Sequence, residues 1–134
     1  MQVPRMQPGR TRVLLLEPNY QLRSAILSVL SEEPYVVEIC DSLEQVLLRA
    51  DASGRTIALV AWQSMEGLLA EEHRQNLAEL THRVRLLVMV PRHWARLLQS
   101  TDLGSLVAGL VAKPVQAEEL FSKLEQALAI PVDS

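Results

Sequence analysis

The chain has 134 residues, of which 49% are hydrophobic and 22% are charged, and its formal net charge is −3. This length suits one domain with a core of ordinary size, and the composition is typical of a soluble globular protein. A net negative charge argues against a general affinity for polyanions such as nucleic acid.

The single cysteine indicates the redox environment of the chain, and the composition of its two ends indicates the domain boundaries. Cys40 can form no disulfide within the chain, so we expect a reducing, cytoplasmic environment. The first apolar run, 13–16, is too short for a signal peptide or a membrane span, and we expect neither. We expect disordered tails at 1–10 and 131–134 around one domain at 11–130.

The first half of the chain predicts two strand–helix units. Asn19 is a suitable N-cap for the first helix, whose apolar residues recur at helical spacing until Pro34 ends the pattern. Ser42 and Gln45 form a capping-box pattern that predicts the start of the second helix, and Gly54 closes this unit. The strands that precede these helices are expected at the apolar runs 12–16 and 35–40.

The second half of the chain continues this alternation. Lys113 and Pro114 are expected to end the last strand, and apolar residues at helical spacing from Ala117 to Leu128 predict a final helix. The other expected strands are 56–61, 84–90 and 106–111, and the other expected helices are 66–80 and 92–101.

The strand pattern predicts the fold class. All five runs are continuously apolar rather than alternating, which is typical of a parallel sheet buried on both faces. Five intervening helices of 10 to 15 residues would cover it, so we expect an α/β, doubly wound, flavodoxin-like fold with five parallel strands. Ligands of such sheets lie beyond the carboxyl ends of the strands. The residues expected at that edge are Glu17, Pro18, Trp62, Gln63, Ser64, Val90, Pro91, Ala112 and Lys113.

At these strand ends the chain resembles the receiver domain of bacterial two-component response regulators, over about residues 12–130. That family carries an acidic pair after its first strand, the phosphorylated aspartate after its third, Ser or Thr after its fourth and Lys-Pro after its fifth. The Gly-x-x-x-Lys-Pro pattern at 109–114 is the most specific local match. The other matching segments are Leu-Leu-Leu-Glu-Pro-Asn at 14–19, Trp-Gln-Ser-Met-Glu-Gly at 62–67 and Val-Pro at 90–91.

The chain departs from this family at the residues that carry its chemistry. The family's acidic residues hold magnesium, which prefers several carboxylate oxygens, but this sequence offers Glu17 alone, followed by Pro18. Trp62 replaces the phosphorylated aspartate, and Val90 lacks the hydroxyl of the switch residue. Leu110 replaces the aromatic residue common on the fifth strand. The resemblance therefore implies a pseudo-receiver that is not an enzyme and needs no cofactor.

Two residues of this edge each have two interpretations. Lys113 contacts the phosphoryl group in the family, but here it could instead form a structural ion pair with Glu17. Trp62 either anchors a ligand or partner or fills the former acidic pocket. The resemblance also implies a cis Lys113–Pro114 bond. Ser64 is interpreted as a loop or capping residue rather than a substitute phosphate acceptor.

The sequence does not support a metal site, and it leaves a nucleic-acid-binding regulator as the least favoured alternative for function. The three histidines show no metal-ligand spacing with one another or with Cys40, so no metal site is predicted. Arginines are frequent between 74 and 96, but they are divided among two helices, a loop and a strand, which is typical of solvated surface. The basic residues of this stretch are Arg74, His82, Arg83, Arg85, Arg92, His93 and Arg96.

Three hypotheses for function follow. The leading one is a signalling module that binds a protein partner, or a second copy of itself, through the fourth helix, fifth strand and last helix, the face that the family uses. The second is a small-molecule sensor with an apolar pocket at Trp62, Val90 and Pro91. The third is phosphorylation through an unusual geometry. The residues expected on the interaction face are Trp94, Leu97, Leu98, Leu103, Leu106 and Leu110, with 116–129.

Overall fold

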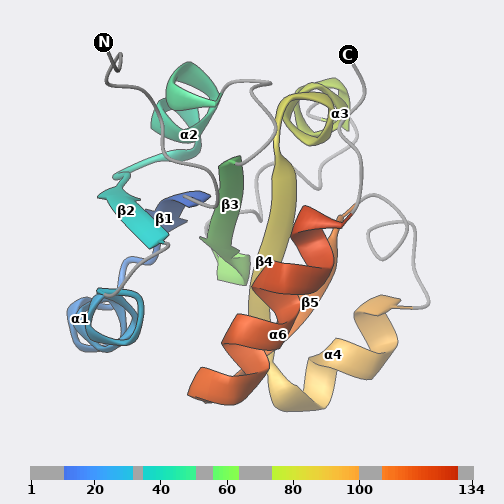
Figure 1. Cartoon of the computed structure of the whole chain (residues 1–134). Helices are drawn as coiled ribbons and strands as arrows, with labels where there is room; N and C mark the ends of the chain where they lie inside the picture. Colours follow the sequence, from blue (N-terminus) through green and yellow to red (C-terminus); the bar gives the residue numbers. More distant parts are fainter. Residues whose placement is uncertain (1–10, 32–34, 51–55, 64–73, 100–106, 130–134) are drawn as a thin grey trace, which may run out of the picture.

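The computed structural model describes residues 11–31, 35–50, 56–63, 74–99 and 107–129. Strands and helices alternate along these ranges (Figure 1). The strands are β1 (Thr11–Leu16), β2 (Tyr35–Ile39), β3 (Thr56–Ala61), β4 (Arg85–Pro91) and β5 (Gly109–Lys113). The described helices are α1 (Tyr20–Val29), α2 (Leu43–Arg49), α3 (Arg74–Arg83), α4 (Arg92–Gln99) and α6 (Ala117–Leu128).

The five strands form one parallel sheet in the order β2-β1-β3-β4-β5. This order confirms the predicted doubly wound α/β fold. The chain leaves β1 in one direction to build β2 and later builds β3 to β5 on the opposite side of β1. The strand order therefore reverses between β1 and β3, and the carboxyl ends of the strands next to this point form the expected site.

Two apolar layers cover the two faces of the sheet. Val13 and Leu15 of β1 point to the face covered by α1 and α6, whereas Leu14 and Leu16 point to the face covered by α2, α3 and α4. Successive side chains of a strand lie on opposite faces, so a strand buried on both faces is apolar at most positions. Figure 1 shows α6 crossing in front of β4 and β5, with α4 beside them.

The predicted N-caps are confirmed, with one correction. The Asn19 side chain accepts a hydrogen bond from the Leu22 N–H at 2.9 Å, and the Ser42 hydroxyl accepts one from the Gln45 N–H at 3.2 Å. In a capping box the Gln45 side chain would accept a hydrogen bond from the Ser42 N–H. Here it accepts one from the Asp41 N–H instead, at 2.7 Å. The predicted helix start is thus correct, but the reciprocal bond reaches one residue further back.

Several predicted boundaries are wrong by a few residues. Helix α3 ends at Arg83 rather than 80, and β4 begins at Arg85 rather than 84, because the Val84 N–H still bonds to the Leu80 carbonyl oxygen. Helix α2 has seven residues, shorter than the expected 10 to 15. Helix α4 is described up to Gln99, and the rest of the predicted helix 92–101 lies outside the described residues. Helix α1 ends at Val29, ahead of Pro34.

The last strand shows the largest shift, since β5 occupies Gly109–Lys113 instead of 106–111. Gly109 pairs with Leu87, and a Cβ at position 109 would lie only 3.1 Å from the Leu87 Cδ2 atom. Glycine therefore permits the close approach that begins this pairing. Several predicted features lie outside the described residues. They are the two tails, Gly54, the part of the third helix at 66–73 and the segment 100–106 after α4.

Candidate functional site at the carboxyl edge of the sheet

Four adjacent strands bring the predicted site residues to one edge. Glu17 follows β1, Trp62 follows β3, and Pro91 and Lys113 end β4 and β5, where they face each other in register. Because the strands are parallel, their carboxyl ends meet there even though 96 positions of sequence separate Glu17 from Lys113. Ser64 lies outside the described residues.

Glu17 and Lys113 form the ion pair that the sequence suggested. The Lys113 Nζ atom lies 2.9 Å from Oε1 of Glu17, and the other carboxylate oxygen, Oε2, accepts a hydrogen bond from the Asn19 N–H at 2.9 Å. The Glu17 side chain is 0% exposed and that of Lys113 is 22% exposed. The acid is thus withdrawn from water. Its Oε2 atom is hydrogen-bonded, whereas Oε1 has no hydrogen-bond partner and is compensated by the charge of the nearby lysine.

The proline that follows Lys113 adopts the geometry that the resemblance implied. The Lys113–Pro114 peptide bond is cis, and the Pro114 ring is exposed. Pro18, at the equivalent place after β1, is exposed as well and has no side-chain oxygen to offer at this edge.

Trp62 is half-buried against the face of the sheet covered by α2, α3 and α4. Its ring centroid lies 6.2 Å from that of Trp94 on α4, with an interplanar angle of 59°. Trp94 remains 42% exposed and also contacts the His93 ring edge-on. The two tryptophans of the chain thus form one tilted aromatic pair, a geometry that aromatic rings favour.

The positions expected to act as a switch are part of the core. Val90 and Leu110 are both buried in the cluster beneath α4, and Ala112 is buried beside them on β5. An apolar side chain in this cluster contributes packing, and it has no hydroxyl or phenol that could follow a phosphoryl oxygen. Leu97 and Leu98 belong to α4, but their side chains are not among those that the structure describes.

The residues at this edge do not fit a magnesium ion. Magnesium is held by carboxylate oxygens in near-octahedral geometry. Within the described ranges, no group of three His, Cys, Asp or Glu side chains could hold a metal. Among the described residues that directly follow β1, β3, β4 and β5, Glu17 is the acid, and its carboxylate is already engaged by Lys113 and Asn19. A cation would have to displace the Lys113 ammonium group, which lies 2.9 Å from the acid.

No protein-family model and no curated protein matches this sequence. Solved structures do match its fold. A response regulator CheY-like protein from Mesorhizobium loti is 16% identical with a TM-score of 0.61, covering 88% of this chain and 98% of its own. The signal receiver domain of an HD domain-containing protein from Pseudomonas fluorescens Pf-5 is 19% identical with a TM-score of 0.64, covering 96% and 93%. That of a modulated diguanylate cyclase from Desulfovibrio desulfuricans G20 is 22% identical with a TM-score of 0.64, covering 90% and 94%.

The chain has the receiver fold. Its strand order and the cis Lys113–Pro114 bond at the end of β5 agree with that assignment. None of the described helices is long and apolar enough to cross a membrane.

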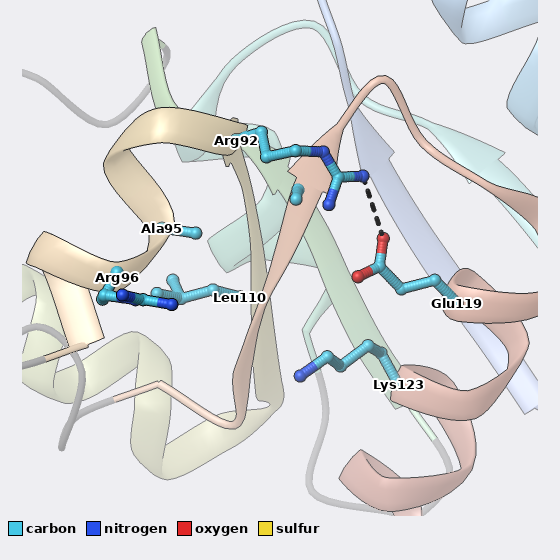
Figure 2. Close-up of a pocket in the computed structure, with 7 residues that line it drawn as sticks. Arg92, Ala95, Arg96, Leu110, Glu119 and Lys123 are labelled. Carbon is cyan, nitrogen blue, oxygen red and sulfur yellow. Dashed lines mark ion pairs between the residues drawn. The ribbon is translucent and has the colours of Figure 1, made fainter.

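The receiver fold also carries a second candidate site, a cavity that is not predicted from the sequence. A cavity of about 280 Å³ lies between α4, β5 and α6, as Figure 2 shows. The sequence interpretation assigned Arg92 and Arg96 to solvated surface and did not single out Glu119 or Lys123. A signal was available, because both pairs have i, i+4 spacing, which places each pair on one face of its helix. The lining residues are Arg92, Ala95, Arg96, Leu110, Ala112, Glu119 and Lys123.

Cys40 is a buried thiol next to β2. Burial raises the pKa of Cys40 above its ordinary value of 9.0, and the nearby Arg49 opposes this effect without cancelling it. The thiol thus stays protonated and unreactive near neutral pH, so it acts as a small apolar side chain of the core.

Proposed function

We propose that this receiver-fold chain is a signalling module that accepts no phosphoryl group and acts by binding a protein partner. The observation that carries the proposal is the buried Glu17–Lys113 ion pair, which uses the acid and the lysine that the edge offers. It satisfies both charges without a metal or a phosphoryl group.

The other edge residues support the same proposal. An acceptor needs a nucleophilic carboxylate, and Trp62 offers an indole N–H donor only. Pro18 adds no metal ligand, and the buried Val90 side chain adds no hydroxyl. The acceptor, the metal ligands and the switch residue are therefore replaced together. Loss of all three favours a role for the surfaces of the domain over a role in phosphoryl transfer, and over an enzymatic function.

Trp62→Asp alone should leave the chain unable to form a phosphoryl or beryllofluoride adduct. The new carboxylate would lie at an edge where Lys113 is already paired with Glu17, and it would lack partner carboxylates for magnesium. Intact-mass spectrometry after incubation with acetyl phosphate and magnesium measures the adduct, and fluorine NMR follows beryllofluoride. A stoichiometric adduct on the unmodified chain or on Trp62→Asp would contradict the proposal.

A matched variant makes this experiment informative. Pro18→Asp, Trp62→Asp and Val90→Thr combined supply a second acid, the acceptor and the hydroxyl on the same scaffold. We expect this triple variant, provided that circular dichroism shows it to be folded, to gain an adduct that Trp62→Asp lacks. The comparison tests whether the missing groups, rather than the scaffold, prevent the reaction.

The interaction surface we propose is formed by α4, β5 and α6. Trp94 is its exposed aromatic residue, whereas Leu110 is buried and can contribute only at the floor of the cavity. Exposed tryptophans are frequent centres of binding energy in protein interfaces. A homodimer through this surface is the simplest form of the proposal.

Trp94→Ala should weaken self-association by roughly tenfold or more, because truncating an interface tryptophan typically costs about 2 kcal/mol. Sedimentation velocity over a concentration series measures the dimer constant. Tyr20→Ala is the matched control, since Tyr20 is a 70% exposed aromatic residue on α1. If the chain is monomeric at every concentration, or if both variants behave alike, the homodimer is excluded.

Among the described residues, no feature favours the small-molecule alternative at Trp62. Trp62 packs against the core and Trp94, and it does not line the cavity between α4, β5 and α6. Ligand binding with quenching of Trp62 fluorescence would revive that hypothesis.

A further inference from the structure

We propose that the cavity between α4, β5 and α6 binds the phosphate group of a small molecule. This proposal goes beyond the proposed function, which requires no ligand, although the cavity opens on the same surface of α4, β5 and α6. The cavity lies apart from the Glu17–Lys113 pair, because neither of those residues lines it.

The charges of the cavity converge from two helices. Arg92 and Arg96 lie one turn apart on α4, and Glu119 and Lys123 lie one turn apart on α6. Figure 2 shows the side-chain nitrogens of Arg96 and Lys123 directed into the space between the two helices. Three cations therefore face one carboxylate, which leaves a surplus of two positive charges in a single hollow of the surface.

These cations are poorly neutralised by the protein itself. The Arg92 Nη2 atom is 4.0 Å from Oε1 of Glu119, too long for a hydrogen bond, and the Arg92 side chain is 59% exposed. Across the described ranges of the chain, Arg96 and Lys123 have no ion-pair partner. Oε1 of Glu119 is itself shielded from solvent and lacks a hydrogen-bond partner there. Glu119 is thus the one acid among the lining residues, and Arg96 and Lys123 keep donors that it does not engage.

The charges and the volume of the cavity favour a phosphate group over a carboxylate. Its floor is apolar, formed by Leu110 and Ala112 of β5, and Ala95 adds an apolar patch from α4. A phosphate monoester carries nearly two negative charges and three acceptor oxygens, which match two arginines and a lysine better than a carboxylate does. The volume of about 280 Å³ is close to the lower limit of roughly 300 Å³ for ligand pockets. It leaves room for part of an organic group beside the phosphate.

Isothermal titration calorimetry on the full chain tests this proposal. The probes are inorganic phosphate, pyrophosphate, adenosine monophosphate and guanosine monophosphate, with citrate as the carboxylate control. We expect saturable binding of at least one phosphate probe and much weaker binding of citrate. Tighter binding of a nucleotide than of inorganic phosphate identifies a phosphorylated organic ligand, and equal binding identifies free phosphate as the ligand.

Two variants should change the affinity for the phosphate probes in opposite directions. Arg96→Gln with Lys123→Gln should weaken binding by at least about a hundredfold, since it removes two hydrogen bonds to a charged group. Glu119→Gln should strengthen binding severalfold, because it removes the repelling carboxylate and releases Arg92. Misfolding could explain weaker binding but not tighter binding. The second variant therefore tests the proposal even if the first one fails to fold.

Arg23→Gln on α1 is the matched control for loss of positive charge, because Arg23 lies over the Tyr20 ring and does not line the cavity. It should bind the phosphate probes as the unmodified chain does. The proposal is overturned if no phosphate probe binds, if citrate binds as tightly, or if Arg23→Gln weakens binding as much as the cavity variant.

Discussion

Replacing Lys113 by methionine should lower the free energy of unfolding by about 3 kcal/mol. The reason is the environment of Glu17, whose side chain has no exposed surface and whose Oε1 atom faces the Lys113 ammonium at 2.9 Å. Methionine keeps most of the apolar stem of lysine but removes the charge, so a buried carboxylate loses its counterion. Urea unfolding at pH 7, followed by far-UV circular dichroism, measures the loss.

Glu17→Gln provides the control for this prediction. Lys113 is 22% exposed, so its ammonium can be partly hydrated once the acid is gone, and we expect Glu17→Gln to cost less than Lys113→Met. The double variant should be more stable than the sum of the single effects predicts, because neither charge is then left alone. Additive effects would show that the ion pair contributes no coupling energy and would remove the main support for its structural role.

Leu59→Ala should be destabilising by about 3 kcal/mol, within the usual range for truncating a fully buried leucine. Leu59 lies in the middle of β3, which is itself flanked by β1 and β4, and its side chain is 0% exposed. It belongs to the cluster covered by α1 and α6, which closes one whole face of the sheet. The midpoint of urea unfolding, with an unchanged slope, measures the effect.

Leu48→Ala is the matched control, since it removes the same atoms from a leucine that is 83% exposed on α2. We expect a change of less than about 0.5 kcal/mol, because little apolar area returns to water and alanine favours a helix. Similar losses in both variants would mean that the two layers described for this sheet do not form its cooperative core.

The elements of the fold could be predicted from local sequence because their signals are local. Strand β3 was located to the residue by its run of six apolar or β-branched side chains, and Asn19 marked the start of α1. The ends of β4 and β5 were displaced because a strand ends where inter-strand hydrogen bonds end, and its register depends on a neighbour far along the chain. Gly109 illustrates this, since a larger residue there would make a tight contact with the Leu87 side chain, which lies 22 positions earlier in the chain.

The candidate site, like the fold, can be predicted from the sequence only in part. The groups that the sheet edge lacks can be read from the sequence, because a missing carboxylate or hydroxyl is a property of Pro18, Trp62 and Val90 wherever they lie. Which groups meet there, and how closely, depends on the packing of strands and helices. The Glu17–Lys113 distance, the Trp62–Trp94 contact and the meeting of the α4 arginines with Lys123 all join segments separated by loops and strands. The reason is that charge pairing and ring packing act through distance and burial, and both are set by how parallel strands and their covering helices stack.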